Sequence, residues 1–142
     1  MSARALRDPA DPAFDRRDTG WGARARDFAV FSRDEVRRVR DHLAEADAMR
    51  ADHDEASFIE DRMAVYAAAY ALVLAGEAAG RVSREFRAQT PEIPWGEIAL
   101  TRHRLAHGVD APDPRLVAEL VFRHLPSALA GVDMLLDQGP AR

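Results

Sequence analysis

The longest stretch without a charged residue runs from Met63 to Gly76, and it limits the folds open to this chain more than any other feature. It is rich in alanine, the strongest helix former. It is too short to span a bilayer, which takes about 20 apolar residues. We therefore interpret it as a buried helix. No segment of the chain has the pattern of a strand hairpin.

A capping box at Ser57 and Glu60 predicts where this helix begins. No proline interrupts it, so we expect it to continue to Ala88. Larger apolar side chains recur on one side of it: Phe58, Met63, Tyr66, Tyr70 and Leu74. We expect Tyr66 and Tyr70 in the core, because aromatic residues at helical spacing are core residues more often than ligand platforms.

Another capping box, Ser32 with Glu35, predicts the start of an earlier helix. Its apolar stripe consists of Val36, Val39, Leu43 and Ala46. We expect this helix to end near Arg50. The preceding residues 1–31 are polar and show no helical period, which indicates a poorly ordered arm.

Proline and glycine mark the limits of two further helices. One is expected over residues 94–107, because a proline suits its first position and Gly108 suits the left-handed residue that ends it. The other begins with Asp113 as its cap and Pro114 at its first position. Pro126 must kink or split this last helix.

The length of 142 residues suits one domain with one core. The elements predict an all-α fold, an antiparallel bundle of four to five helices. We divide the chain into an N-terminal arm over residues 1–31, a helical domain over residues 32–137 and a C-terminal tail over residues 138–142.

Composition excludes several kinds of chemistry. The chain has no cysteine, so disulfides, cysteine nucleophiles and zinc–thiolate sites are excluded. All 20 basic residues are arginines, so no lysine is present for a phosphate loop or a Schiff base. The net charge of −4 means that nucleic-acid binding would need a local arginine patch. No signal-peptide pattern is present, and we expect a soluble, cytoplasmic protein without membrane association.

The window most suited to chemistry covers Arg102, His103, Arg104 and His107 at the end of the predicted third helix. Carbonyl groups at a helix end stabilise a protonated histidine, and such a histidine can act as a general acid or base. Arginine can hold a phosphate and offset the charge that builds up on it. These residue types suit cleavage of a phosphodiester without a metal.

Spacing leaves structural alternatives open. Arg102 and His107 are five residues apart, so on an ideal helix they point roughly 140° from each other. A two-fold dimer would let them converge on one phosphate. Arg37 and His42 have the same spacing and receive no role, and cations at a helix end are also ordinary stabilisers. Glu77 interrupts the apolar stretch, either facing solvent or pairing with an arginine such as Arg102 or Arg104.

No metal or cofactor is expected. The acidic run of residues 52–55 includes His53 and could resemble a metal site, but a solvated linker is the more usual reading of such a charged run. The chain has no cysteine and no clear H-x3-H pattern. A glycine-rich phosphate loop is also absent from the sequence.

Several short motifs agree in order and spacing with the HepT-like toxin family of the HEPN superfamily, which the chain resembles over residues 33–137. The motifs are Gly76–Glu77–Ala78–Ala79, Val82–Ser83–Phe86, Pro91–Glu92–Ile93–Pro94–Trp95, Ile98, Arg102–Arg104–Leu105–His107–Gly108 and Leu125–Pro126.

The resemblance implies a homodimeric HEPN bundle with an R-x4-6-H motif from each protomer in a cleft at the interface. It places the arginine on Arg102 and the histidine on His107, with His103, Arg104 and Glu77 in support. Related proteins cleave RNA through the ribose 2′-hydroxyl without a metal. They are paired with a minimal nucleotidyltransferase antitoxin that can add AMP to a tyrosine.

Two positions depart from the pattern. His103 stands where the family often has asparagine. Val109 stands where those relatives have the modified tyrosine, and valine has no hydroxyl to accept AMP at this position. Two alternatives to a ribonuclease toxin therefore stay open. One is a non-catalytic module that binds RNA, a nucleotide or a nucleotidyltransferase, and the other is a structural dimer in which the arginines only stabilise a helix end.

Overall fold

A computed structural model describes residues 21–106 and 111–138, with side chains for residues 33–105 and 111–138. Throughout these residues the regular elements are helices, which confirms the predicted all-α class. In chain order they are α1 (Trp21–Arg50), α2 (Glu55–Glu60), α3 (Arg62–Arg81), α4 (Arg84–Gln89), α5 (Trp95–Ala106), α6 (Pro114–Glu119), the π-helical turn η2 (Leu120–His124) and α7 (Leu125–Asp137).

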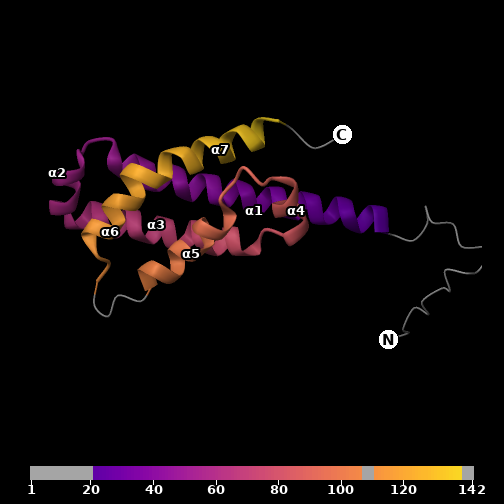
Figure 1. Cartoon of the computed structure of the whole chain (residues 1–142), viewed down its shortest axis with the longest axis horizontal. Helices are drawn as coiled ribbons and strands as arrows, with labels where there is room; N and C mark the ends of the chain where they lie inside the picture. Colours follow the sequence, from indigo (N-terminus) through magenta and orange to yellow (C-terminus); the bar gives the residue numbers. More distant parts are fainter. Residues whose placement is uncertain (1–20, 107–110, 139–142) are drawn as a thin grey trace, which may run out of the picture.

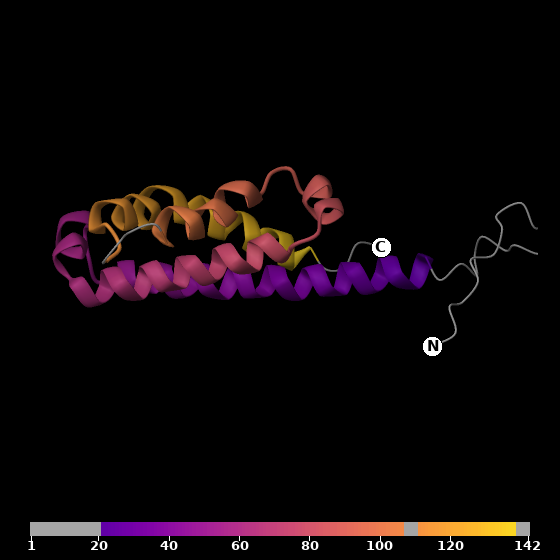
Figure 2. The same cartoon turned by 90° about the horizontal axis from the view of Figure 1, so that it is seen from below.

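The bundle is built on two long helices, α1 and α3, which run antiparallel and side by side (Figure 1). α5 packs on α3 and runs antiparallel to it, while α7 packs on α1. The N-terminal part of α1 extends beyond the other helices (Figure 2). The core lies where these helices meet, and its largest fully buried side chains are Phe58, Val36, Val39, Val65, Val117, Val121 and Val132.

The first helix begins at Trp21 and not at the predicted Ser32, so it crosses the predicted boundary between arm and domain. Glu35 does not act as the predicted capping glutamate. It is buried, and its carboxylate pairs with Arg38 at 2.6 Å and with Arg81 of α3 at 3.2 Å. Ser32 and Glu35 lie inside the helix and not at its start. No proline interrupts the residues from Trp21 to Ser32, so the helix can extend through them.

The predicted single helix from Ser57 to Ala88 is wrong, because the chain breaks twice in that range. Asp61 is extended (φ −92°, ψ 94°) and accepts a hydrogen bond from the amide of Ala64, which starts α3. The second break is at Ser83, whose side chain caps α4. The short polar side chains of aspartate and serine offer the backbone amides a partner outside the helix, which is why both residues favour helix starts.

Ser57 has a different role from the predicted one. Asp54 is the residue that caps α2, and its carboxylate accepts a hydrogen bond of 2.7 Å from the amide of Ser57. This backbone hydrogen bond is the main cause that lowers the pKa of the Asp54 carboxyl.

The predictions for the last helices are confirmed. α5 occupies Trp95–Ala106, close to the predicted range, and Asp113 caps α6 with Pro114 at its first position. The last helix is divided, as predicted from Pro126, into α6 and α7 with the π-helical turn η2 between them. In this turn the amide of Leu125 donates a hydrogen bond to the carbonyl of Leu120. This register accommodates a proline that lacks an amide hydrogen. Gly108 lies outside the described residues.

α3 buries its small side chains and exposes its larger ones, so the expectation for the two tyrosines is wrong. Tyr66 and Tyr70 are 40% and 66% exposed, and Met63 is 84% exposed. The buried residues of α3 are mostly alanines, which let α1 and α5 approach closely. By length and composition alone α3 could cross a membrane, the only such case among the described helices, but 56% of that window is buried within the bundle.

Candidate functional site

The start of α5 is fixed by hydrogen bonds within the turn that precedes it. The indole nitrogen of the buried Trp95 donates to the hydroxyl oxygen of Thr90 at 2.9 Å, and that hydroxyl donates to the carbonyl of Phe86 at 2.9 Å. The rings of Phe86 and Trp95 also meet edge to face. These contacts hold α5 at one angle to the bundle, which determines where its last turns lie.

A glycine on α3 brings α5 close at the position of Arg102. A Cβ atom added to Gly76 would lie only 3.0 Å from the Cβ of Arg102 and 3.0 Å from the carbonyl oxygen of Ile98. Such a contact is at the limit of what packed atoms tolerate, so the absence of a side chain at Gly76 allows the observed approach. The same glycine places Arg102 beside the next residue of α3, Glu77.

Arg102 and Glu77 form an ion pair, which is one of the two alternatives that the sequence left open for Glu77. The Nε atom of Arg102 lies 3.5 Å from Oε1 of Glu77, and the two side chains are 58% and 36% exposed. A guanidinium has five N–H donors. The printed contact with Glu77 is through Nε, and the Arg102 side chain is more than half exposed, so its guanidinium is accessible to a phosphate.

The histidines of the predicted site are described only in part. His103 is exposed on α5. His107, together with Gly108 and Val109, lies outside the described residues. The structure therefore positions Arg102 and Glu77 of the candidate site, and the convergence of Arg102 with His107 stays a prediction.

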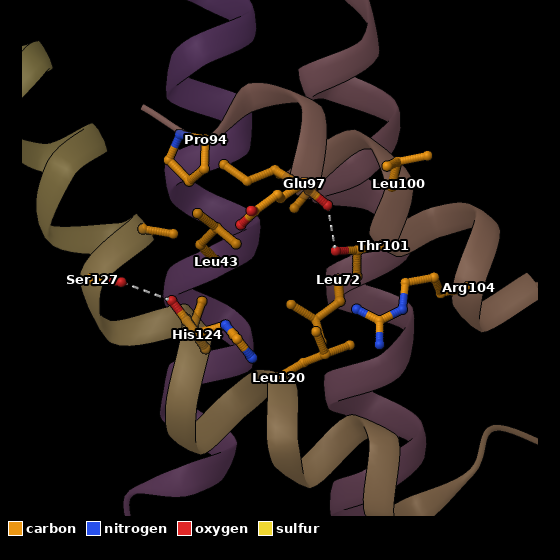
Figure 3. Close-up of a pocket in the computed structure, with 14 residues that line it drawn as sticks. Leu43, Leu72, Pro94, Glu97, Leu100, Thr101, Arg104, Leu120, His124 and Ser127 are labelled. Carbon is orange, nitrogen blue, oxygen red and sulfur yellow. Dashed lines mark hydrogen bonds between the residues drawn. The ribbon is translucent and has the colours of Figure 1, made fainter. Parts of the chain in front are cut away.

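Arg104 points to the other side of α5 from Arg102. It lines a pocket of about 300 Å³ that lies between α1, α3, α5 and the segment from η2 to α7 (Figure 3). Two residues along a helix correspond to a rotation of roughly 200°, which explains why the two arginines diverge. Arg104 makes no ion pair within the described part of the chain, so it does not share Glu77 with Arg102.

The pocket combines an apolar floor with a polar rim. Leu43, Leu72 and Leu120 contribute to its floor. His124 and Ser127 stand across the opening from Arg104 (Figure 3). Apolar walls with a few polar groups are typical of small-molecule sites, and this pocket does not include Arg102 or Glu77. Sequence reasoning gave no signal for it, since its residues come from four segments far apart in the chain.

The acidic run of residues 52–55 leads into α2, with Asp52 and Asp54 exposed and His53 and Glu55 half-buried. His53 contacts Asp61 at 3.0 Å through Nε2 and the hydroxyl of Ser57 at 3.1 Å through Nδ1. Across the described ranges no group of three histidine, aspartate or glutamate residues is arranged to hold a metal ion.

The exposed tyrosines of α3 are the surface feature that the sequence interpretation missed. Tyr66, Tyr70 and Glu77 follow one another at spacings of four and seven, so they lie on one helix face. A charged residue on that face was the signal available in the sequence, because a glutamate inside an apolar stripe indicates exposure.

An all-helical bundle with an exposed arginine near the end of its fifth helix, paired with a carboxylate of its third, fits the HEPN class of proteins. The family model described as "Ribonuclease HepT-like" matches residues 39–134. The chain therefore belongs to the HepT-like ribonuclease family of the HEPN superfamily, as the sequence motifs predicted.

Individual relatives agree with this assignment. The chain is 34% identical over 70 residues to a protein of Thermococcus cleftensis named "Probable ribonuclease HepT", which covers 49% of this chain and 64% of that protein. It is 31% identical over 84 residues to a Methanocaldococcus jannaschii protein whose name describes an RNase, covering 59% and 77% of the two chains. The chain thus spans just under two thirds of the first relative and somewhat more of the second. No solved structure matches the chain.

Proposed function

We propose that this chain is a metal-independent endoribonuclease that acts as the toxin of a toxin–antitoxin pair in the cytoplasm. The observation that carries the proposal is the position of Arg102. In a member of a ribonuclease family, Arg102 is an exposed arginine paired with Glu77 near the end of α5, five residues before His107 in the sequence.

The proposed reaction uses the RNA's own 2′-hydroxyl as the nucleophile. A histidine base, His107, takes the proton of that hydroxyl while its oxygen attacks the adjacent phosphorus. The bond from phosphorus to the 5′-oxygen breaks, and that oxygen leaves with a proton from a histidine. The products are a 2′,3′-cyclic phosphate and a 5′-hydroxyl. Arg102 binds the phosphate oxygens and stabilises the negative charge of the transition state.

This chemistry requires two copies of the chain. On an ideal helix the directions of Arg102 and His107 differ by roughly 140°, so one α5 does not aim both groups at one phosphate. A homodimer supplies each group twice across an isologous interface. His103 and Arg104 belong to the same segment and are proposed to bind the flanking RNA backbone.

The test is cleavage of a labelled RNA by the purified full chain in EDTA. Arg102→Ala and His107→Ala should each reduce the rate at least about 100-fold, the usual cost of removing a transition-state donor or an acid–base group. Arg37→Ala and His42→Ala are matched controls, because they have the same spacing on α1 and are paired with Asp34 and Glu45. Equal rates for all five proteins, or loss of cleavage in EDTA, would refute the proposal.

The proposed partner is a minimal nucleotidyltransferase that neutralises the toxin by forming a complex. Val109 carries no hydroxyl that could accept AMP, so complex formation is favoured over modification at that position. The same departure, together with His103, favours a second candidate function, a non-catalytic module that binds RNA or the nucleotidyltransferase. Expression in cells separates the two, because a free toxin arrests growth and a binding module does not.

A further inference from the structure

The pocket between α5 and the segment from η2 to α7 lies outside the pair of Arg102 and Glu77 on which the proposed reaction depends. Its volume is about 300 Å³, which is within the range of small-molecule sites in proteins. Its walls come from α1, α3, α5, η2 and α7, so its shape is fixed by the packing of the whole bundle. The residues that line it indicate what kind of molecule would fit.

The floor of the pocket favours a ligand with an apolar body. Leu43, Leu72, Ile98 and Leu120 line it, and all four are buried. A polar group placed against them would lose its hydrogen bonds to water without gaining a partner, which is costly. Apolar side chains of a ligand would instead be stabilised by leaving water there.

Two opposite charges at the pocket have no ion-pair partner among the described residues. Glu97 and Arg104 both line it (Figure 3), and both are exposed. They are seven residues apart on α5, close to two full turns, so they lie on one face of the helix. The same spacing separates them by about 10.5 Å along the helix axis. A ligand that carries both an ammonium group and a carboxylate could contact the two residues together.

Two hydroxyl groups at the pocket add hydrogen-bond acceptors. The hydroxyl of Thr101 donates to the carbonyl of Glu97 at 3.0 Å, and that of Ser127 donates to the carbonyl of His124 at 3.2 Å. A hydroxyl has one hydrogen and two lone pairs, so each oxygen can still accept a hydrogen bond. An amide N–H is a donor that suits them.

From the apolar floor, the two charges and the hydroxyl acceptors we infer that the pocket binds a short apolar peptide with free termini. Its ammonium group pairs with Glu97, and its carboxylate pairs with Arg104. A single amino acid is too short to reach both residues, because its two charges belong to one residue. A dipeptide extends over about 7 Å, and a charge-assisted hydrogen bond of about 2.8 Å at each end covers the remaining distance.

A role in helix stability alone predicts a different behaviour for these two residues. Glu97 lies in the first turn of α5 and Arg104 in the last, where their charges also favour the helix. That role would lower the melting temperature of Glu97→Gln and Arg104→Gln. It would not make either residue sensitive to the chemical form of a peptide terminus, so terminus-specific binding separates the two roles.

Titration calorimetry of the full chain with dileucine tests the inference. N-acetyl-dileucine lacks the ammonium group, and dileucine amide lacks the carboxylate. Each should bind at least about tenfold more weakly than dileucine, because a hydrogen bond to a charged group is lost. Diglycine keeps both charges but has no apolar side chains, and it should bind more weakly by at least the same factor.

Two variants assign each peptide terminus to its residue. Glu97→Gln should lose the preference for dileucine over its N-acetyl form, and Arg104→Gln should lose the preference over the amide. Glu92→Gln and Arg115→Gln are matched controls and should keep both preferences, since these residues are exposed and do not line the pocket. Circular dichroism should show the same helical content in all four variants.

Three outcomes would overturn the inference. The first is the absence of saturable binding of dileucine up to millimolar concentration. The second is an equal affinity for diglycine, which would remove the role of the apolar floor. The third is discrimination between the peptide termini that persists in Glu97→Gln and Arg104→Gln, which would place the peptide elsewhere on the molecule.

The inference does not rest on the proposed ribonuclease activity, and the two can fail separately. Arg102→Ala should bind dileucine like the wild type, although its RNA cleavage is expected to be lost. Arg104 is also proposed to contact RNA, whereas Glu97 is not. Glu97→Gln should therefore change peptide binding and leave the rate of RNA cleavage in the absence of peptide unchanged.

Discussion

The two faces of α3 are both apolar, yet one belongs to the core and the other to the surface. The core face consists largely of alanines, with Ala68 and Ala75 fully buried and Leu72 nearly so. The outer face carries the larger side chains of Met63, Tyr66 and Tyr70. The difference shows that side-chain size, and not hydrophobicity alone, decided which face the bundle buried. Small residues let two neighbouring helices approach, whereas the large ones remain exposed.

The strongest test of this comparison is truncation on each face. Leu72→Ala should lower the free energy of unfolding by about 2 to 5 kcal/mol, because it leaves a cavity between packed helices. Met63→Ala should change it by no more than about 0.5 kcal/mol, as is usual for exposed positions. Both should be measured by urea denaturation at the same protein concentration. Similar losses at the two positions would remove the distinction between the faces.

The second test adds volume instead of removing it. Gly76→Val should cost about 1 to 3 kcal/mol of stability, because the added atoms would displace Arg102 and the backbone of α5. Gly80→Ala is the matched control on the same helix, since nothing lies within 4 Å of an added Cβ there. It should raise stability by about 0.5 to 1 kcal/mol through helix propensity. Relative to the wild type, the melting temperature should fall in Gly76→Val and rise in Gly80→Ala. A rise in Gly76→Val would contradict the close approach of α5.

The smallest expected effect concerns the start of α3, which fixes both faces in register. Asp61→Ala removes the cap that accepts from the amide of Ala64 at 3.1 Å and should cost about 1 kcal/mol. Asp61→Ser keeps a capping oxygen and should recover most of that loss, although both variants lose the contact with His53. If serine behaves like alanine in thermal unfolding, the contact with His53 and not the cap is the stabilising part.

Local signals predicted some element limits well and others poorly. The Asp113–Pro114 start and the range of α5 were correct, because proline leaves the backbone few alternatives there. The predicted start of the first helix at Ser32 was wrong, and so was the prediction that one helix continues through Asp61. Serine and aspartate occur both inside helices and at helix caps. Which of the two positions they occupy depends on how the rest of the chain packs.

The sequence by itself determined the all-helical class and the family, and it predicted the residues of the candidate site, because helix punctuation and short motifs are properties of neighbouring residues. Only the tertiary structure decided that Glu77 pairs with Arg102, that Arg104 faces a separate pocket, and that Tyr66 and Tyr70 lie on the surface. These relations join residues of different helices. They depend on the rotation of each helix about its axis, which is set by the close packing of small side chains such as Gly76 and not by any local pattern.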